Sequence, residues 1–184
     1  MREVFYKHRR MKGIDNSMIR FKNFDCEHGS RKYPNTPYPT FCIRLPEHLA
    51  EEMREEGWYI RDYVPGPNAP EGAESYSFIQ VTIRLYKEPE LQSKNPNIVE
   101  LSNGKATPIL WNEVKNLQKY NIDKISVDLS PYCKGSNFEE RGASAYLSSM
   151  NVFIKKSEIE EEREEYLNSF TEDEEDDQEE EVPF

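Results

Sequence analysis

The segment Tyr76–Lys87, YSFIQVTIRLYK, alternates in character from one residue to the next. Its aliphatic side chains all fall on one side, at Ile79, Val81, Ile83 and Leu85. A period of two is the spacing of a β-strand with one buried face. The apolar face of such a strand must be buried against other strands or helices. This segment therefore favours a mainly β fold.

Further strands are predicted wherever this alternation recurs, at residues 17–24, 41–45, 58–63, 98–101, 122–132 and 143–156. In the fifth of these, Ile125, Val127 and Leu129 should point inward. The last should place Tyr146, Ser148, Met150, Val152 and Ile154 on one side. Helices are expected from Pro46 to Gly57 and, in short form, over residues 111–120. Five to seven strands with one or two short helices predict a small, partly open β-barrel.

The second face of Tyr76–Lys87 is unusual for a surface. It carries Tyr76, Phe78, Gln80, Thr82, Arg84 and Tyr86. This face is too apolar for a routine solvated surface and too polar for a second core. Bases that stack on the rings beside a cation would explain the composition. The alternative, that these rings pack against a helix or a neighbouring strand, stays open at this point.

The net charge of −11 is the sum of two unlike parts. Residues 157–184 hold 15 of the 35 acidic residues and one of the 24 basic ones, which gives this segment −14 and leaves the rest of the chain at +3. The rest also carries 19 of the 22 aromatic residues. The predicted division is a basic N-terminal arm at 1–16, a domain at 17–156 and a disordered acidic tail at 157–184. Aromatic residues among cations indicate single-stranded nucleic acid as a partner, whereas an acidic tail alone could simply be solubilising.

Catalytic and cofactor signatures are missing from the sequence. No glycine-rich phosphate loop, zinc-protease, nucleophile-elbow or deaminase motif occurs, so we expect neither an enzyme nor a cofactor. Cys26, Cys42 and Cys133 are odd in number and widely spaced, so disulfides and a metal site are not expected. No apolar run approaches the 20 or so residues of a membrane span, and a soluble, intracellular protein without a membrane partner is expected.

The last residues, Val182, Pro183 and Phe184, form the most specific local signal. They follow a run of Asp and Glu and offer an aromatic ring together with a terminal carboxylate. These groups suit an apolar pocket beside a basic residue, so a partner-docking role is predicted for them.

Several segments carry a resemblance to a known family. The ending EEEVPF is similar to the acidic tip of bacterial single-stranded DNA-binding proteins. The body resembles a bacteriophage single-stranded DNA-binding protein family, in the segments RFKNF, RKYPNTPYPTFCIRL, LAEEMREEGWYIRDYVP, YSFIQVTI, IDKISVDLSPY and ASAYLSSMNVFI. The similarity covers residues 17–156.

The resemblance implies an OB-like barrel that binds single strands without a cofactor or metal, during phage DNA replication, recombination or repair in the cytoplasm of the infected bacterial host. The acidic tail would then recruit replication or recombination proteins. The arm at 1–16 would bind DNA or mediate self-association of neighbouring copies on DNA. The sequence leaves both roles open.

Two sets of residues are predicted to contact DNA. Backbone contacts are assigned to Arg20, Lys22, Arg44, Arg61, Arg84 and Lys87. Base stacking is assigned to Phe24, Tyr33, Tyr38, Trp58, Tyr76, Phe78 and Tyr86. Two other functions remain as alternatives, namely an acidic protein-interaction module or DNA mimic, and an RNA-binding OB domain.

Overall fold

The structure is a computed structural model. It describes residues 4–133, 141–155, 162–163 and 165–169. The chain divides into two compact units, Met1–Ile154 and Lys155–Phe184. Within the second unit, residues 162–163 and 165–169 are helical. The predicted docking residues Val182, Pro183 and Phe184 lie outside the described residues.

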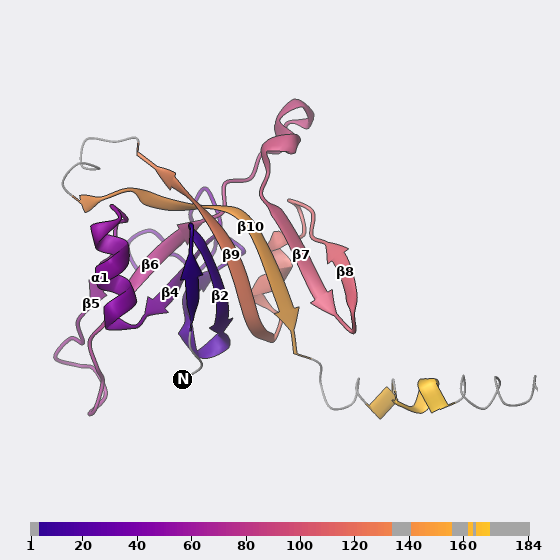
Figure 1. The fold of residues 1–184 in the computed structure, drawn as a ribbon, viewed down its shortest axis with the longest axis horizontal. Coiled ribbons are helices and arrows are strands. Elements are labelled where there is room, and N and C mark those ends of the chain that lie inside the picture. The colour runs from indigo at the N-terminus through magenta and orange to yellow at the C-terminus, as the bar shows by residue number, and fades with distance from the viewer. Residues whose placement is uncertain (1–3, 134–140, 156–161, 164, 170–184) are drawn as a thin grey trace, which may run out of the picture. The chain divides into compact units, whose positions relative to one another are not determined.

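The first unit is built on one ten-stranded sheet (Figure 1). Its strands are β1 (Phe5–Lys7), β2 (Arg10–Asp15), β3 (Ile19–Asn23), β4 (Thr40–Leu45), β5 (Arg61–Tyr63), β6 (Tyr76–Thr82), β7 (Asn97–Ser102), β8 (Lys105–Pro108), β9 (Ile122–Tyr132) and β10 (Ser144–Ile154). The main path through the sheet runs β1-β2-β9-β10-β6-β4-β3. The predicted mainly β, OB-like and partly open fold is confirmed, although the expected five to seven strands were too few.

Helices are few and short, as predicted. In the described part of the first unit, the longest helix is α1 (Glu47–Glu55), which buries Leu49, Ala50 and Met53. The expected helix at 111–120 is only a 3-10 turn, η3 (Val114–Gln118), and two further turns are η1 (Asn16–Met18) and η2 (Pro89–Lys94). Within the described part of the chain, no helix has the length and apolar character needed to cross a membrane.

The N-terminal segment is part of the sheet, so the prediction of a separate arm at 1–16 is wrong for its described residues. Strands β1 and β2 form an antiparallel hairpin, and β2 pairs with β9 through Met11↔Val127 and Ile14↔Ile125. Both Met11 and Ile14 are fully buried. These two apolar residues indicate a strand, but they lie among cations, and the prediction relied on the net charge of the segment instead.

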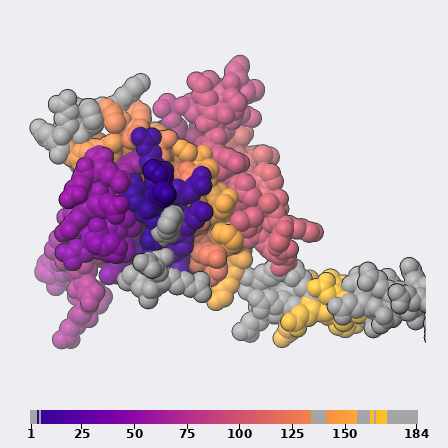
Figure 2. Space-filling model, viewed as in Figure 1, coloured from indigo at the N-terminus to yellow at the C-terminus, as the bar shows by residue number. Residues whose placement is uncertain are grey.

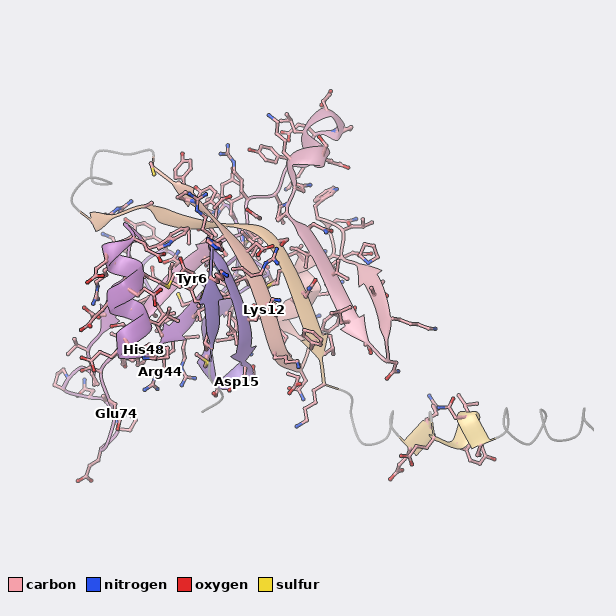
Figure 3. The ribbon with its side chains drawn as sticks, viewed as in Figure 1. Tyr6, Lys12, Asp15, Arg44, His48 and Glu74 are labelled. Atoms are coloured by element: carbon pink, nitrogen blue, oxygen red, sulfur yellow. The ribbon has the colours of Figure 1, made fainter. Side chains whose placement is uncertain are left out.

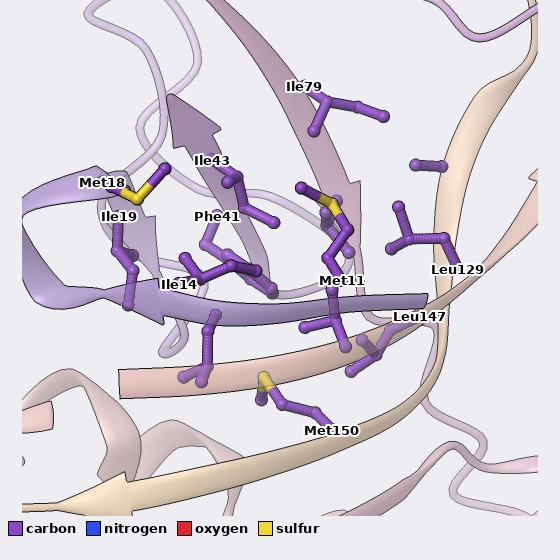
Figure 4. Close-up of a cluster of buried hydrophobic side chains, with 14 of the residues drawn as sticks. Met11, Ile14, Met18, Ile19, Phe41, Ile43, Ile79, Leu129, Leu147 and Met150 are labelled. Carbon is purple, nitrogen blue, oxygen red and sulfur yellow. The ribbon is translucent and has the colours of Figure 1, made fainter. Parts of the chain in front are cut away.

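The barrel core lies between the inner faces of strands from both halves of the sheet. Figure 4 shows Met11 and Ile14 of β2 facing Phe41 and Ile43 of β4. Ile79, Val81 and Ile83 are completely buried, which confirms the inner face predicted for this segment, although the strand ends at Thr82 and not at Lys87. Because the sheet curls so that these inner faces meet, the outer face of β2 and the outer face of β4 point in different directions.

The long hairpin of β9 and β10 confirms one predicted face and corrects another. Ile125, Val127 and Leu129 point inward as expected. In β10, however, the buried residues are Ala145, Leu147, Met150 and Val152. A β-bulge between Leu147 and Ser149 adds one residue to the strand and exchanges the two faces. Tyr146 therefore lies on the outer face, apart from Met150 and Val152.

Gly142 fits the close approach of two chain segments before β10. Its φ is +100°, and a Cβ built there would lie 2.7 Å from the backbone carbonyl group of Trp58. We expect Gly142→Ala to lower the free energy of unfolding by about 2 kcal/mol or more, measured by urea denaturation, because strain and overlap add. Gly72→Ala is the control: its φ is +85° but nothing lies within 4 Å of the added Cβ. Equal losses in both variants would contradict the close approach.

Candidate nucleic-acid interface

The strand register gathers aromatic and basic side chains on the outer face of the sheet. Directly opposed residues of neighbouring strands project to the same face. Arg44 of β4 is opposite Phe78 of β6, and Thr82 of β6 is opposite Tyr146 of β10. The outer face therefore continues from β4 across β6 to β10.

The first group on this face consists of Phe21, Tyr63, Tyr76 and Phe78, and we call it the Phe21 cluster. Its rings lie close to one another, with centroids 5.7 Å apart for Phe21 and Phe78 and 4.9 Å apart for the stacked pair Tyr63 and Tyr76. Phe21 is 54% exposed. One open aromatic ring thus rests on a layer of supporting rings.

Arginine side chains flank the Phe21 cluster. The guanidinium of Arg44 lies 4.9 Å from the ring centre of Tyr76, and that of Arg61 lies 5.5 Å from the ring centre of Phe78. Arg61 also donates to Oε1 of Gln80 at 3.1 Å. A hollow beside them is lined by Arg20, Phe21, Arg44, Tyr63, Gly72, Ala73, Glu74 and Tyr76. Figure 3 shows Arg44 and Glu74, whose charged groups are 3.8 Å apart.

The second group consists of Tyr38, Arg84, Tyr86, Tyr132 and Tyr146, and we call it the Arg84 cluster. The guanidinium of Arg84 lies 5.1 Å from the ring centre of Tyr86 and 6.0 Å from that of Tyr38. Tyr132 and Tyr146 stack with ring centres 4.5 Å apart and nearly parallel planes. The cluster joins side chains from four separate segments of the chain.

Arg84 has a polar atom without a partner. Its Nε is buried and makes no hydrogen bond among the described residues. A buried donor without an acceptor costs about 1–3 kcal/mol, so such groups are rare unless a ligand or solvent satisfies them. An acceptor supplied by a ligand, such as a phosphate oxygen, would remove this cost.

The tyrosine side chains of both clusters remain in their uncharged form. Burial raises the pKa of Tyr76 and of Tyr146 above the ordinary value, against the opposing influence of nearby arginines. Burial also raises the pKa of the Cys42 thiol to about 12. These phenols and the thiol are therefore neutral at physiological pH and add no negative charge that would repel a phosphate.

Comparison with known proteins agrees with this surface. Residues 1–182 match the model of the family described as "Putative phage ssDNA-binding domain". The chain belongs to this family. It is a bacteriophage single-stranded DNA-binding protein, as its sequence resemblance implied. The match includes the N-terminal hairpin, which the resemblance had left outside. No curated protein and no solved structure matches the chain significantly.

Two of the predicted DNA-binding residues are core residues in this family member, so their assignment to base stacking is wrong. Phe24 is 1% exposed and packs against Phe41, with ring centres 5.5 Å apart. Trp58 is 5% exposed, and its Nε1 donates to the hydroxyl of Tyr6 at 3.2 Å. Neither ring has a free face for a base.

The other predicted residues divide into three groups. Brought together on the outer face are Arg20, Tyr38, Arg44, Arg61, Tyr76, Phe78, Arg84 and Tyr86. Phe78 is itself buried, so it supports the Phe21 cluster from below. Lys22 turns aside and donates to Oδ1 of Asn16 at 2.7 Å. Tyr33, 63% exposed, and Lys87 lie on loops, apart from the ring contacts of the two clusters.

Four residues of the interface were missed from the sequence, namely Phe21, Tyr63, Tyr132 and Tyr146. Simple alternation along residues 17–24 would place Phe21 on the same face as Ile19, but its φ of +50° and the bulge between Arg20 and Asn23 turn it outward. Tyr146 was assigned to the wrong face because of the bulge in β10. The stack of Tyr132 on Tyr146 depends on strand pairing, which only the three-dimensional structure gives.

Proposed function

We propose that this protein coats single-stranded DNA during phage DNA replication or recombination, holding the strand across the Phe21 and Arg84 clusters. The observation that carries the proposal is that one outer face gathers arginines, one exposed ring and several half-buried rings, from six strands and the neighbouring loops. Base stacking on protein rings is worth about 1–3 kcal/mol per base and tolerates any sequence. A coating protein needs this tolerance.

The arginines of the interface would contact the phosphates. Within the described residues, Arg44 has an acidic partner in Glu74, whereas Arg20, Arg61 and Arg84 form no ion pair with a carboxylate. A guanidinium without a carboxylate partner is free to bind a phosphate oxygen in a forked geometry. The unpartnered Nε of Arg84 supports a phosphate at this position in particular.

A salt titration tests the role of the arginines. The double substitution Arg61→Gln and Arg84→Gln should flatten the dependence of the logarithm of affinity on the logarithm of salt concentration. Each lost phosphate contact lowers that slope by about 0.7 on single strands, so two lost contacts lower it by about 1.4. The control pair Lys105→Gln and Lys115→Gln removes the same charge from exposed positions elsewhere and should leave the slope unchanged. Equal slopes in both double variants would contradict phosphate binding by Arg61 and Arg84.

The acidic tail is the second part of the proposal. Its charge of −14 would attract basic surfaces of replication and recombination proteins, and Val182, Pro183 and Phe184 would dock on them. The same charge would compete with DNA for the arginines of the interface. The protein would act in the cytoplasm of the infected bacterium, as a binding protein without a cofactor.

Deletion of residues 171–184 tests both roles of the tail. We expect an unchanged melting temperature, severalfold tighter binding of single-stranded DNA, and loss of capture of the host or phage replication proteins. Phe184→Ala is the matched variant: it keeps the charge, so DNA affinity should stay at the wild-type value while capture is lost. Weaker DNA binding after the deletion would exclude competition by the tail.

Two other functions are separated by simple experiments. An acidic interaction module or DNA mimic would show no gel shift with single-stranded DNA even after deletion of the tail. An RNA-binding domain would prefer RNA in a competition between oligonucleotides of the same sequence, because contacts to the 2′-hydroxyl discriminate the two nucleic acids. The family match favours DNA.

A further inference from the structure

The β1–β2 hairpin carries a basic hollow on a part of the surface that the proposed interface does not use. The hollow is lined by Lys7, His8, Arg10 and Lys12. The described residues that line it are three cations and one imidazole. Figure 2 shows this hairpin, in indigo, open on the face turned to the viewer, and Figure 3 labels Lys12 on it.

The tip of the hairpin is built in an uncommon way. His8 and Arg9 have φ values of 49° and 66°, the left-handed region that Asn and Gly normally occupy in such turns. Residues with a full side chain are disfavoured there. The tip nevertheless holds an imidazole and a guanidinium in the solvent, next to Lys7 and Arg10.

The cations of the hollow share one face of the hairpin. Lys7 is opposite Arg10 in the register, and Lys12 follows Arg10 by two residues in β2. Asp128 of β9 pairs with Arg10 at 2.6 Å, and this contact lowers the pKa of the Asp128 carboxyl group. Lys7 and Lys12 have no ion pair with any described residue. Among the described residues here, three cations face one carboxylate, that of Asp128, so a net charge of +2 remains at the hollow.

The hollow continues the outer face beyond the Arg84 cluster. Tyr146 of that cluster is opposite Ser130 of β9. Two residues earlier in β9, Asp128 is opposite Arg10 of β2, which is opposite Lys7 of β1. The separation is three strand spacings, about 14 Å across the sheet. A nucleic-acid backbone that leaves the Arg84 cluster could cover this distance within a few nucleotides.

We infer that the hairpin hollow is a second phosphate site, on which the backbone of the same DNA strand continues after the Arg84 cluster. The three cations of this site would bind the backbone through charge. The inference rests on the proposed function, because the strand must first occupy the aromatic clusters. A long DNA strand would then contact both the aromatic clusters and the hairpin hollow, whereas a short DNA strand would contact the aromatic clusters alone.

The test compares a short and a long oligonucleotide, of 8 and 30 nucleotides, on the full chain carrying Lys7→Gln and Lys12→Gln. Affinity for the short strand should equal that of the wild type. For the long strand, the salt slope should fall by about 1.4, and affinity at 0.1 M salt should fall on the order of tenfold. Lys94→Gln with Lys119→Gln removes the same charge from exposed positions outside the hairpin and should change neither value.

Three results would overturn the inference. The first is that the Lys7→Gln, Lys12→Gln variant binds the long oligonucleotide as tightly as the wild type does, while its binding still depends on Phe21 and Tyr146. The second is an equal loss on both strands, which indicates a general electrostatic effect. The third is tighter binding by the hairpin variant that vanishes once residues 171–184 are deleted, because the hollow would then hold the acidic tail. Undiminished binding after loss of Phe21 and Tyr146 would instead refute the proposed function.

Discussion

Replacing Phe21 and Tyr146 together by alanine should weaken the binding of single-stranded DNA by at least about 30-fold. Each substitution removes the ring on which we place one base, and each stacked base contributes about 1–3 kcal/mol. Two independent losses add to about 2–6 kcal/mol, and about 1.4 kcal/mol corresponds to a tenfold change in affinity. Phe21 is 54% exposed, so its removal leaves the core intact. Fluorescence anisotropy with a labelled oligonucleotide at fixed salt measures the effect.

Two controls separate stacking from other causes. Phe21→Tyr with Tyr146→Phe keeps both rings and should keep affinity within about twofold, since the π face is the contact. Tyr120→Ala removes an exposed ring outside both clusters and should have no effect. An alanine double variant that melts and binds as the wild type does would eliminate the two rings from the interface.

Phe41→Ala should be the most damaging single substitution for stability that we consider. Phe41 is fully buried in β4, packs against Phe24 and pairs in register with Val81 of β6. Truncation of a buried Phe costs about 3–5 kcal/mol through lost transfer free energy and the cavity left behind. Because small domains are stable by only about 5–15 kcal/mol, this variant should lose a large part of its stability.

Urea denaturation gives the measurement for Phe41→Ala. The midpoint should fall strongly while the slope of free energy against urea stays constant, since the unfolded surface is nearly the same. Leu110→Ala, at an apolar position that is 57% exposed, should change stability by no more than about 0.5 kcal/mol. Similar losses of unfolding free energy in the two variants would mean that Phe41 of β4 is not part of the core.

The fold was predictable from the sequence where the strands are regular and contain no bulge. Alternation alone located β6, β9 and β10 and identified the inner faces of β6 and β9. In a regular strand, successive side chains point to opposite faces, so the apolar residues identify the buried face. The α1 helix likewise followed from Pro46, the spacing of its apolar residues and Gly57.

Prediction failed where the backbone departs from regularity or where distant segments meet. A bulge adds one residue and reverses every following side chain. Met150 and Val152 follow the bulge in β10, so their face did not reveal the face of Tyr146, which precedes it. Regular alternation from the buried Ile19 would bury Phe21 and expose Phe24, but the bulge between Arg20 and Asn23 reverses the two. Charge counting made residues 1–16 a separate arm and overlooked the buried Met11 and Ile14.

The central claim is that single strands bind by base stacking on an outer face of the sheet, with arginines holding the backbone. The most direct test is to titrate labelled single-stranded and double-stranded oligonucleotides of equal length across a range of salt concentrations. We predict that single strands bind at least about 30-fold more tightly than duplex at every salt concentration, because paired bases cannot stack on the Phe21 and Arg84 clusters. Equal affinity for duplex and single strands, with the same salt dependence, would contradict the claim.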